Sequence, residues 1–98
     1  MNVEELERKI GALMDAASRL TGPERVLKRI EIRNLENDID GTATVDILDR
    51  LNRIELPDLQ TIDRQIQAAK DATAAEARRA EAIGTAIGII RTGLGLVL

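Results

Sequence analysis

Residue types that bind calcium lie close together in the stretch ENDIDGT. The residues that match positions 1, 3, 5 and 6 of an EF-hand loop are Glu36, Asp38, Asp40 and Gly41. Position 12 of such a loop needs a bidentate glutamate, but Ile47 stands there, and position 1 is glutamate rather than aspartate. The stretch therefore favours a solvated turn, and we expect no metal site.

Basic residues cluster just before this stretch, where nucleic acid could bind. They are Arg25, Lys28, Arg29 and Arg33. Glu24 and Glu31 interrupt the cluster, the chain has no aromatic residue to stack on a base, and its formal net charge is -3. These features favour a solvated helix face, and we expect no nucleic-acid partner.

Catalytic chemistry has little support in the sequence. The chain has no histidine or cysteine, the usual general bases and strong nucleophiles. Its carboxylates alternate with arginine and lysine along polar faces, and its C-terminal glycines lack the strand, turn and lysine of a phosphate-binding loop. We therefore expect no enzyme, no catalytic residue and no cofactor.

The composition restricts how the chain can bury apolar surface. The 98 residues suffice for one small domain, which we assign to residues 1–98. Without phenylalanine, tyrosine or tryptophan, the interior must be built from leucine, isoleucine, valine and alanine. Such side chains suit narrow seams between helices, so the composition indicates an all-α protein.

The first half of the chain starts with a clear helix over residues 2–20. Its apolar residues recur every three or four positions, and Asn2 is placed to cap its first turn. Residues 23–43 are ambiguous. The alternation in LKRIEIRNL allows a small β-hairpin of Lys28–Arg33 against Thr42–Val45, whereas Pro23 favours a helix continuing through Arg33.

The second half starts with a short helix over residues 44–55. Thr44 is a suitable N-cap, and Pro57 ends or kinks this helix. Residues 57–98 then follow a heptad pattern that only Thr73 and Glu76 interrupt. One continuous helix over this stretch would be about 60 Å long, at about 1.5 Å per residue.

The heptad seam predicts an oligomer interface. Its apolar positions are Leu59, Ile62, Ile66, Ala69, Ala80, Ile83, Ile87, Ile90, Leu94 and Val97. Isoleucine rather than leucine at the second seam position favours a trimer or a larger oligomer. Gly84 and Gly88 are four residues apart, a spacing that lets helices pack closely.

The apolar C-terminal stretch, residues 82–98, leaves a membrane role open. As a helix it would reach about 25 Å, which is short of a hydrocarbon core of about 30 Å. It also contains Arg91, a costly residue inside a membrane. Membrane contact is therefore an alternative that we do not favour.

These observations predict an elongated, coiled-coil-like protein with a long C-terminal helix. The expected function is structural: an assembly, scaffold or connector subunit, for example of a phage or another particle, that self-associates through the C-terminal seam. The alternatives are a small membrane-associated protein using residues 82–98 and an adaptor that binds a helix of another protein. The acidic start NVEELERK is unlike a secretory signal, so we expect a cytoplasmic location or one within a particle.

Overall fold

A computed structural model describes residues 1–96 of the chain, and these residues form five α-helices without any strand. The helices are α1 (Val3–Ala17), α2 (Gly22–Asp40), α3 (Thr44–Arg53), α4 (Leu56–Lys70) and α5 (Glu76–Gly93). The prediction of an all-α protein is thus confirmed.

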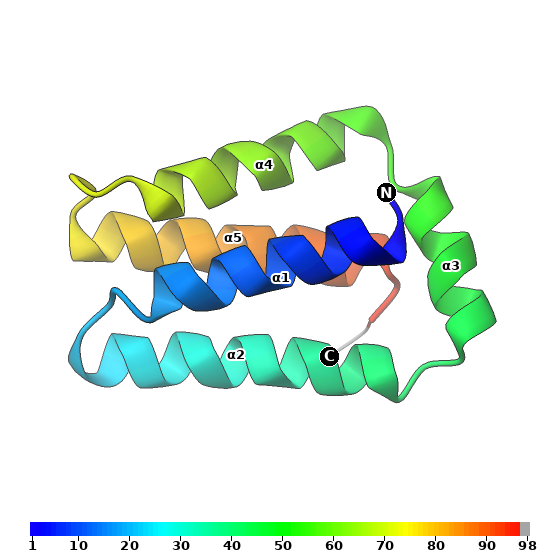
Figure 1. The fold of residues 1–98 in the computed structure, drawn as a ribbon, viewed down its shortest axis with the longest axis horizontal. Helices are drawn as coiled ribbons and strands as arrows, with labels where there is room; N and C mark the ends of the chain where they lie inside the picture. The colour runs from blue at the N-terminus through cyan, green and yellow to red at the C-terminus, as the bar shows by residue number, and fades with distance from the viewer. Residues whose placement is uncertain (97–98) are drawn as a thin grey trace.

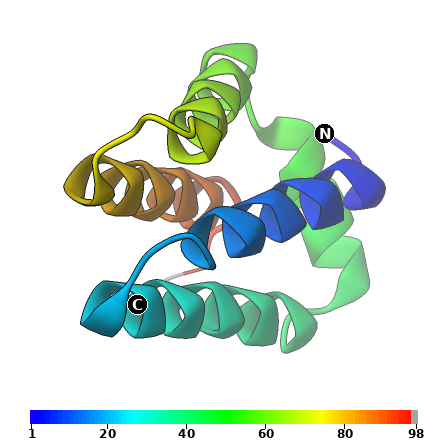
Figure 2. The same ribbon diagram turned by 60° about the vertical axis from the view of Figure 1, so that its left-hand side comes forward.

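The helices pack around α5, which contacts all the others. Helices α1, α2, α4 and α5 run along the long axis of the molecule, and α3 lies across one end (Figure 1). The turned view shows α5 between α4 and α2, with α1 beside them (Figure 2). Sequential helices reverse direction at the turns between α1 and α2 and between α4 and α5, which gives a short bundle.

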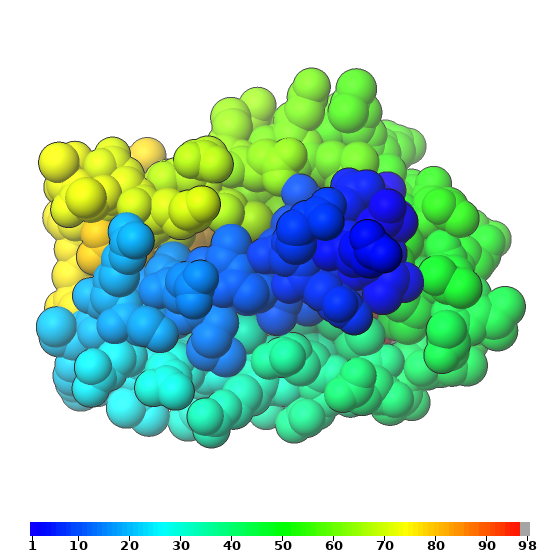
Figure 3. Space-filling model, in the orientation of Figure 1, coloured from blue at the N-terminus to red at the C-terminus, as the bar shows by residue number. Residues whose placement is uncertain are grey.

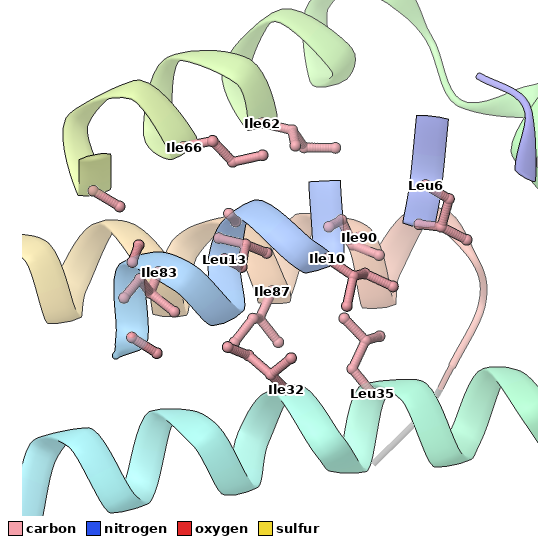
Figure 4. Close-up of a cluster of buried hydrophobic side chains, with 14 of the residues drawn as sticks. Leu6, Ile10, Leu13, Ile32, Leu35, Ile62, Ile66, Ile83, Ile87 and Ile90 are labelled. Atoms are coloured by element: carbon pink, nitrogen blue, oxygen red, sulfur yellow. The ribbon is translucent and has the colours of Figure 1, made fainter. Parts of the chain in front are cut away.

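The core of the bundle consists of isoleucine, leucine and alanine side chains from all five helices. Leu6, Ile10 and Leu13 of α1 point into the space between α2, α4 and α5 (Figure 4). The buried alanines Ala16, Ala69 and Ala86 let neighbouring helices approach closely without aromatic side chains between them. Burial of this apolar surface is the main stabilising contribution in a bundle of this kind.

The predicted hairpin does not form. Residues 28–33 lie inside the continuous helix α2, and residues 42–45 span a short loop and the start of α3. Ile32, Leu35 and Ile39 recur at spacings of three and four and face the interior, so the helical period governs this segment. Pro23 lies in the first turn of α2, as the helical alternative required.

The predicted long C-terminal helix is also wrong, because the chain breaks between Lys70 and Glu76 and folds back on itself. The molecule measures 38 × 25 × 21 Å, so it is not an elongated coiled coil. The heptad pattern continues across the break because α4 and α5 each direct one apolar face into the same core.

Side chains secure the break between α4 and α5. The guanidinium group of Arg79 donates from Nε to the Ala69 carbonyl at 2.9 Å and from a terminal nitrogen to the Asp71 carbonyl at 2.8 Å. The Asp71 carboxylate accepts from the backbone N–H of Thr73 at 2.9 Å. A cation at the last carbonyls of α4 satisfies groups that every helix end leaves without an intrahelical partner.

Two capping predictions have different outcomes. Asn2 caps α1, because its side chain accepts from the Glu5 backbone N–H at 2.8 Å. Thr44 is the first residue of α3, and Ala43 occupies the cap position without a side-chain hydrogen bond. Helix α3 ends at Arg53, before Pro57, so the predicted boundary near that proline is correct to within a few residues.

Candidate protein-binding surface

The residues predicted to form an oligomer interface lie inside the chain's own core. Buried residues of that set are Ile62, Ile66, Ala69, Ala80, Ile83, Ile87, Ile90 and Leu94. Leu59 is partly buried against the same core, and Val97 lies outside the described residues. Ile83 is 0% exposed within a single chain, so it has no surface left to bury against a second copy. A single chain therefore already covers most of the predicted seam, and self-association stays a prediction.

The glycines predicted to allow close helix packing differ from each other. A Cβ atom at Gly84 would lie 3.4 Å from Lys28 Nζ of α2, an ordinary contact, whereas nothing lies within 4 Å of such an atom at Gly88. The close approach occurs at Gly93, where a Cβ would come within 2.9 Å of Ile54 Cγ1. Gly93 thus allows α5 to pack against the end of α3.

Helix α2 carries three large apolar side chains that are about half exposed in the described part of the chain. Val26 is 55% exposed, Leu27 is 52% exposed and Ile30 is 47% exposed. They lie within two turns of one helix, so they form one apolar patch, which we call the α2 apolar patch. Single exposed apolar residues are common on proteins, but a contiguous group marks a candidate binding surface.

Charge is divided unevenly along α2. Its first half contains the basic cluster, and its last turns contain Glu36, Asp38 and Asp40 without any basic residue. Acidic groups in a last turn are unfavourable there, by about 0.3–1 kcal/mol each, because the C-terminal end of a helix dipole is negative. Arg91 of α5 pairs with Asp38 at 2.7 Å, but Asp40 has no such partner among the described residues.

A groove between α1 and α2 lies beside this acidic end. It joins a hollow of about 400 Å³, closed at one end by α3, to a smaller one of about 260 Å³, and both hollows share Glu7, Ile10 and Glu36. Its apolar walls include Leu6 and Ile39. We call it the α1–α2 groove, and Figure 3 shows the face on which α1 and α2 lie on either side of it.

The rim of the α1–α2 groove is acidic. Glu7, Glu36 and Asp40 line it, and no lysine or arginine of the described residues 1–96 does. An apolar floor with a carboxylate rim has the chemistry to bind a segment that is both apolar and basic. The α2 apolar patch, flanked by Arg25 and Arg29, has that composition.

The stretch compared with a calcium loop is not a loop. Glu36, Asp38 and Asp40 belong to the last turns of α2, and Gly41 follows as its C-cap. In the described part of the chain, no group of three or more His, Cys, Asp or Glu residues is placed to hold a metal ion.

Two carboxyl groups at the turn between α4 and α5, those of Asp71 and Glu76, have lowered pKa values. Hydrogen bonds from Thr73 lower the pKa of Asp71, and the charge of Arg79 adds to this effect. Glu76 accepts from both the hydroxyl group and the backbone N–H of Thr21, and these bonds lower the pKa of Glu76. Both carboxylates are bonded within the chain, which points to a structural role.

Two findings bear on the alternative functions. Within residues 1–96, no helix is long and apolar enough to cross a membrane. The apolar side chains of residues 82–96 mostly lie in the core, so this segment has little apolar surface to offer any partner.

The α2 apolar patch was missed by sequence reasoning, although a signal was present. Once residues 22–40 are read as one helix, Ile32, Leu35 and Ile39 define the buried face, and Val26 and Ile30 fall on the other side. Comparison with protein-family models, with curated proteins and with solved structures gives no match for this chain. The function is therefore inferred from the α2 apolar patch and the α1–α2 groove.

Proposed function

We propose that the protein is a non-enzymatic assembly module that self-associates through the outer face of α2. The observation that carries this proposal is the α2 apolar patch, three large apolar side chains that lie together and are each about half exposed. Covering such side chains is favourable by about 25 cal/mol per Å² of apolar surface removed from water. The described part of the C-terminal seam has little apolar surface left for this assembly, because most of its side chains are already buried.

Sedimentation equilibrium over a wide concentration range tests the proposal. We expect the wild-type mass to rise above that of one chain and Ile30→Asp to weaken this association, since an unpaired charge is costly in an interface. Val45→Asp is the matched control, because Val45 is also apolar and exposed but lies on α3. A wild-type chain that stays monomeric throughout, or an Ile30→Asp variant that associates as well as the wild type, contradicts the proposal.

An adaptor that binds a helix of another protein is the second candidate, favoured by the acidic rim of the α1–α2 groove. Its partner would be a basic amphipathic helix with apolar residues for the groove floor and lysine or arginine for Glu7 and Glu36. A designed helical peptide of leucine and lysine is a suitable probe. We expect it to bind to the chain and to bind more weakly to Glu7→Gln/Glu36→Gln; equal binding to both proteins would contradict this role.

A further inference from the structure

Four charged residues on α2 form a row along the flank that faces the α1–α2 groove. They are Arg25, Arg29, Glu36 and Asp40, and all four are exposed. Their intervals of four, seven and four residues each return to nearly the same side of a helix with about 3.6 residues per turn. We call this row the α2 charge stripe.

The stripe is symmetric under reversal of the helix, with the signs exchanged. The interval from Arg25 to Arg29 equals the interval from Glu36 to Asp40. Two such helices packed antiparallel about a twofold axis would therefore place Arg25 opposite Asp40 of the second copy. They would also place Arg29 opposite Glu36 of that copy, and the axis would repeat both pairs at the other end.

The charged groups of the stripe are unused within one chain. None of the four makes an ion pair or a side-chain hydrogen bond among the described residues, although Asp38 and Lys28 on the same helix do. The acidic half of the stripe lies on the rim of the α1–α2 groove. The basic half lies beside the exposed Val26 and Ile30.

We propose that two copies of this chain pair through antiparallel α2 helices, with the basic half of each stripe on the acidic groove rim of the other. The exposed Val26 lies beside the basic half of the stripe, so it borders the paired surface. The inference rests on the proposed self-association, centres it on the flank of α2 next to the α2 apolar patch, and specifies its symmetry and register. It replaces the predicted trimer, whose basis was a seam that is buried within the chain.

Charge exchange tests this register. The acidic variant Arg25→Glu/Arg29→Glu and the basic variant Glu36→Lys/Asp40→Lys should each associate at least about tenfold more weakly than wild type, because like charges then face each other at both ends. An equimolar mixture should recover association near the wild-type strength, since every pair is again opposite in sign. Native mass spectrometry would identify the recovered species as the mixed dimer.

Arg33 gives a second test, with the opposite sign. In the proposed register it lies beside the axis, close to Arg33 of the second copy. Arg33→Ala should therefore strengthen pairing severalfold at low salt and lose this advantage at high salt, where charge repulsion is screened. Any register that places Arg33 against an acidic residue predicts weaker pairing instead.

Controls separate the possible failures. Arg64→Glu/Arg78→Glu carries the same charge change on exposed sites of α4 and α5 and should associate like the wild type. If the wild type associates but both charge variants associate equally well, the register is overturned while self-association stands. A wild type that is monomeric overturns both proposals.

A membrane surface is the competing partner for the basic apolar half of α2. Flotation with phosphatidylserine vesicles tests it directly. Binding that requires Arg25 and Arg29, by a wild type that shows no self-association, overturns the pairing of two copies. Absence of vesicle binding by a wild type that dimerises supports the pairing.

Discussion

Helices α5 and α2 differ in how their apolar side chains are covered, and the difference is opposite to what their sequences suggest. Helix α5 belongs to the most apolar part of the chain, and its large side chains Ile83, Ile87 and Ile90 are buried in one chain. Helix α2 is rich in charge, yet it holds the α2 apolar patch. Helix α5, whose sequence predicted an interface with a partner, is the helix whose apolar side chains are buried within its own chain.

The difference shows that apolar content alone does not identify a binding surface. Burial free energy depends on the area removed from water and not on which chain removes it. Helix α5 contacts every other helix, so its apolar faces find cover within the molecule. Helix α2 lies at the side of the bundle, and its buried side chains among the described residues, Ile32 and Leu35, lie on one face. A free apolar face on a helix that is otherwise polar is therefore more informative than an apolar helix.

Matched truncations of isoleucine should give the largest contrast between the two helices. Ile83→Ala should lower the free energy of unfolding by about 2–5 kcal/mol, because it leaves a cavity in the core. Ile30→Ala should change it by less than about 0.5 kcal/mol, since the side chain is exposed. Urea denaturation at low protein concentration measures both values without a contribution from association. Similar losses for the two variants would mean that α2 is covered in the monomer.

Arginine substitutions sharpen the comparison for charged residues. Arg79 of α5 is only 8% exposed and donates to two carbonyls at the end of α4. Arg79→Met should cost about 1–3 kcal/mol, because those carbonyls lose their partner in a buried place. Arg29→Met, on the exposed side of α2, should leave the stability of the monomer within about 0.5 kcal/mol of wild type. The same urea titrations apply, and equal costs would contradict this assignment of Arg79.

Glycine substitutions test whether α5 is covered on every side. Gly93→Ala should destabilise the fold by about 1 kcal/mol or more, because the new methyl group would press on Ile54. Gly88→Ala should stabilise it by about 0.5–1 kcal/mol, since the position is open and alanine favours a helix. Thermal unfolding followed by circular dichroism measures both shifts. A loss at Gly88 would show that a close partner, such as a second copy, covers the outer face of α5.

Acid titration should give the smallest effect, confined to the turn that precedes α5. The pKa values of Asp71 and Glu76 are lower in the folded chain than their ordinary values of 3.8 and 4.5. Their contribution to stability is therefore complete above those ordinary values and is lost as the pH falls through the lower, folded-state values. Asp71→Asn and Glu76→Gln should each reduce the loss of unfolding free energy as the pH falls into the acid range. Ile30→Ala is the control and should keep the wild-type pH dependence. An unchanged acid slope in both variants would contradict the pKa shifts.

Several local features were predictable because they depend on neighbours in the sequence. The cap at Asn2, the turn that contains Gly22 with its positive φ of 59°, and the helix start at Pro23 all follow from short-range chemistry. The break between α4 and α5 was missed because DATAAEA has no strong helix-breaking residue. Distant partners help to define it: Arg19 donates to the Lys70 carbonyl at 2.8 Å, and Thr21 donates to Glu76.

The heptad pattern of residues 57–98 could not predict the candidate binding surface on α2. That pattern correctly selected residues that are buried, but it assigned them to contacts between chains. Periodicity identifies the face of a helix that will leave water and contains no information about what covers it. The α2 charge stripe was readable in principle, since its four residues follow helical spacing, but only after residues 22–40 were known to be one helix.

The sequence by itself determined that this protein is helical, that its interior is aliphatic, and where most of its helices begin. Helix propensity, capping and the spacing of apolar residues act over a few residues, so they can be predicted from the sequence. Only the tertiary structure decided that α4 and α5 fold back on each other, that α5 is covered by its own chain, and that the outer side of α2 stays exposed. The physical reason is that apolar burial has no direction: many arrangements cover the same surface, and contacts between distant residues select one of them.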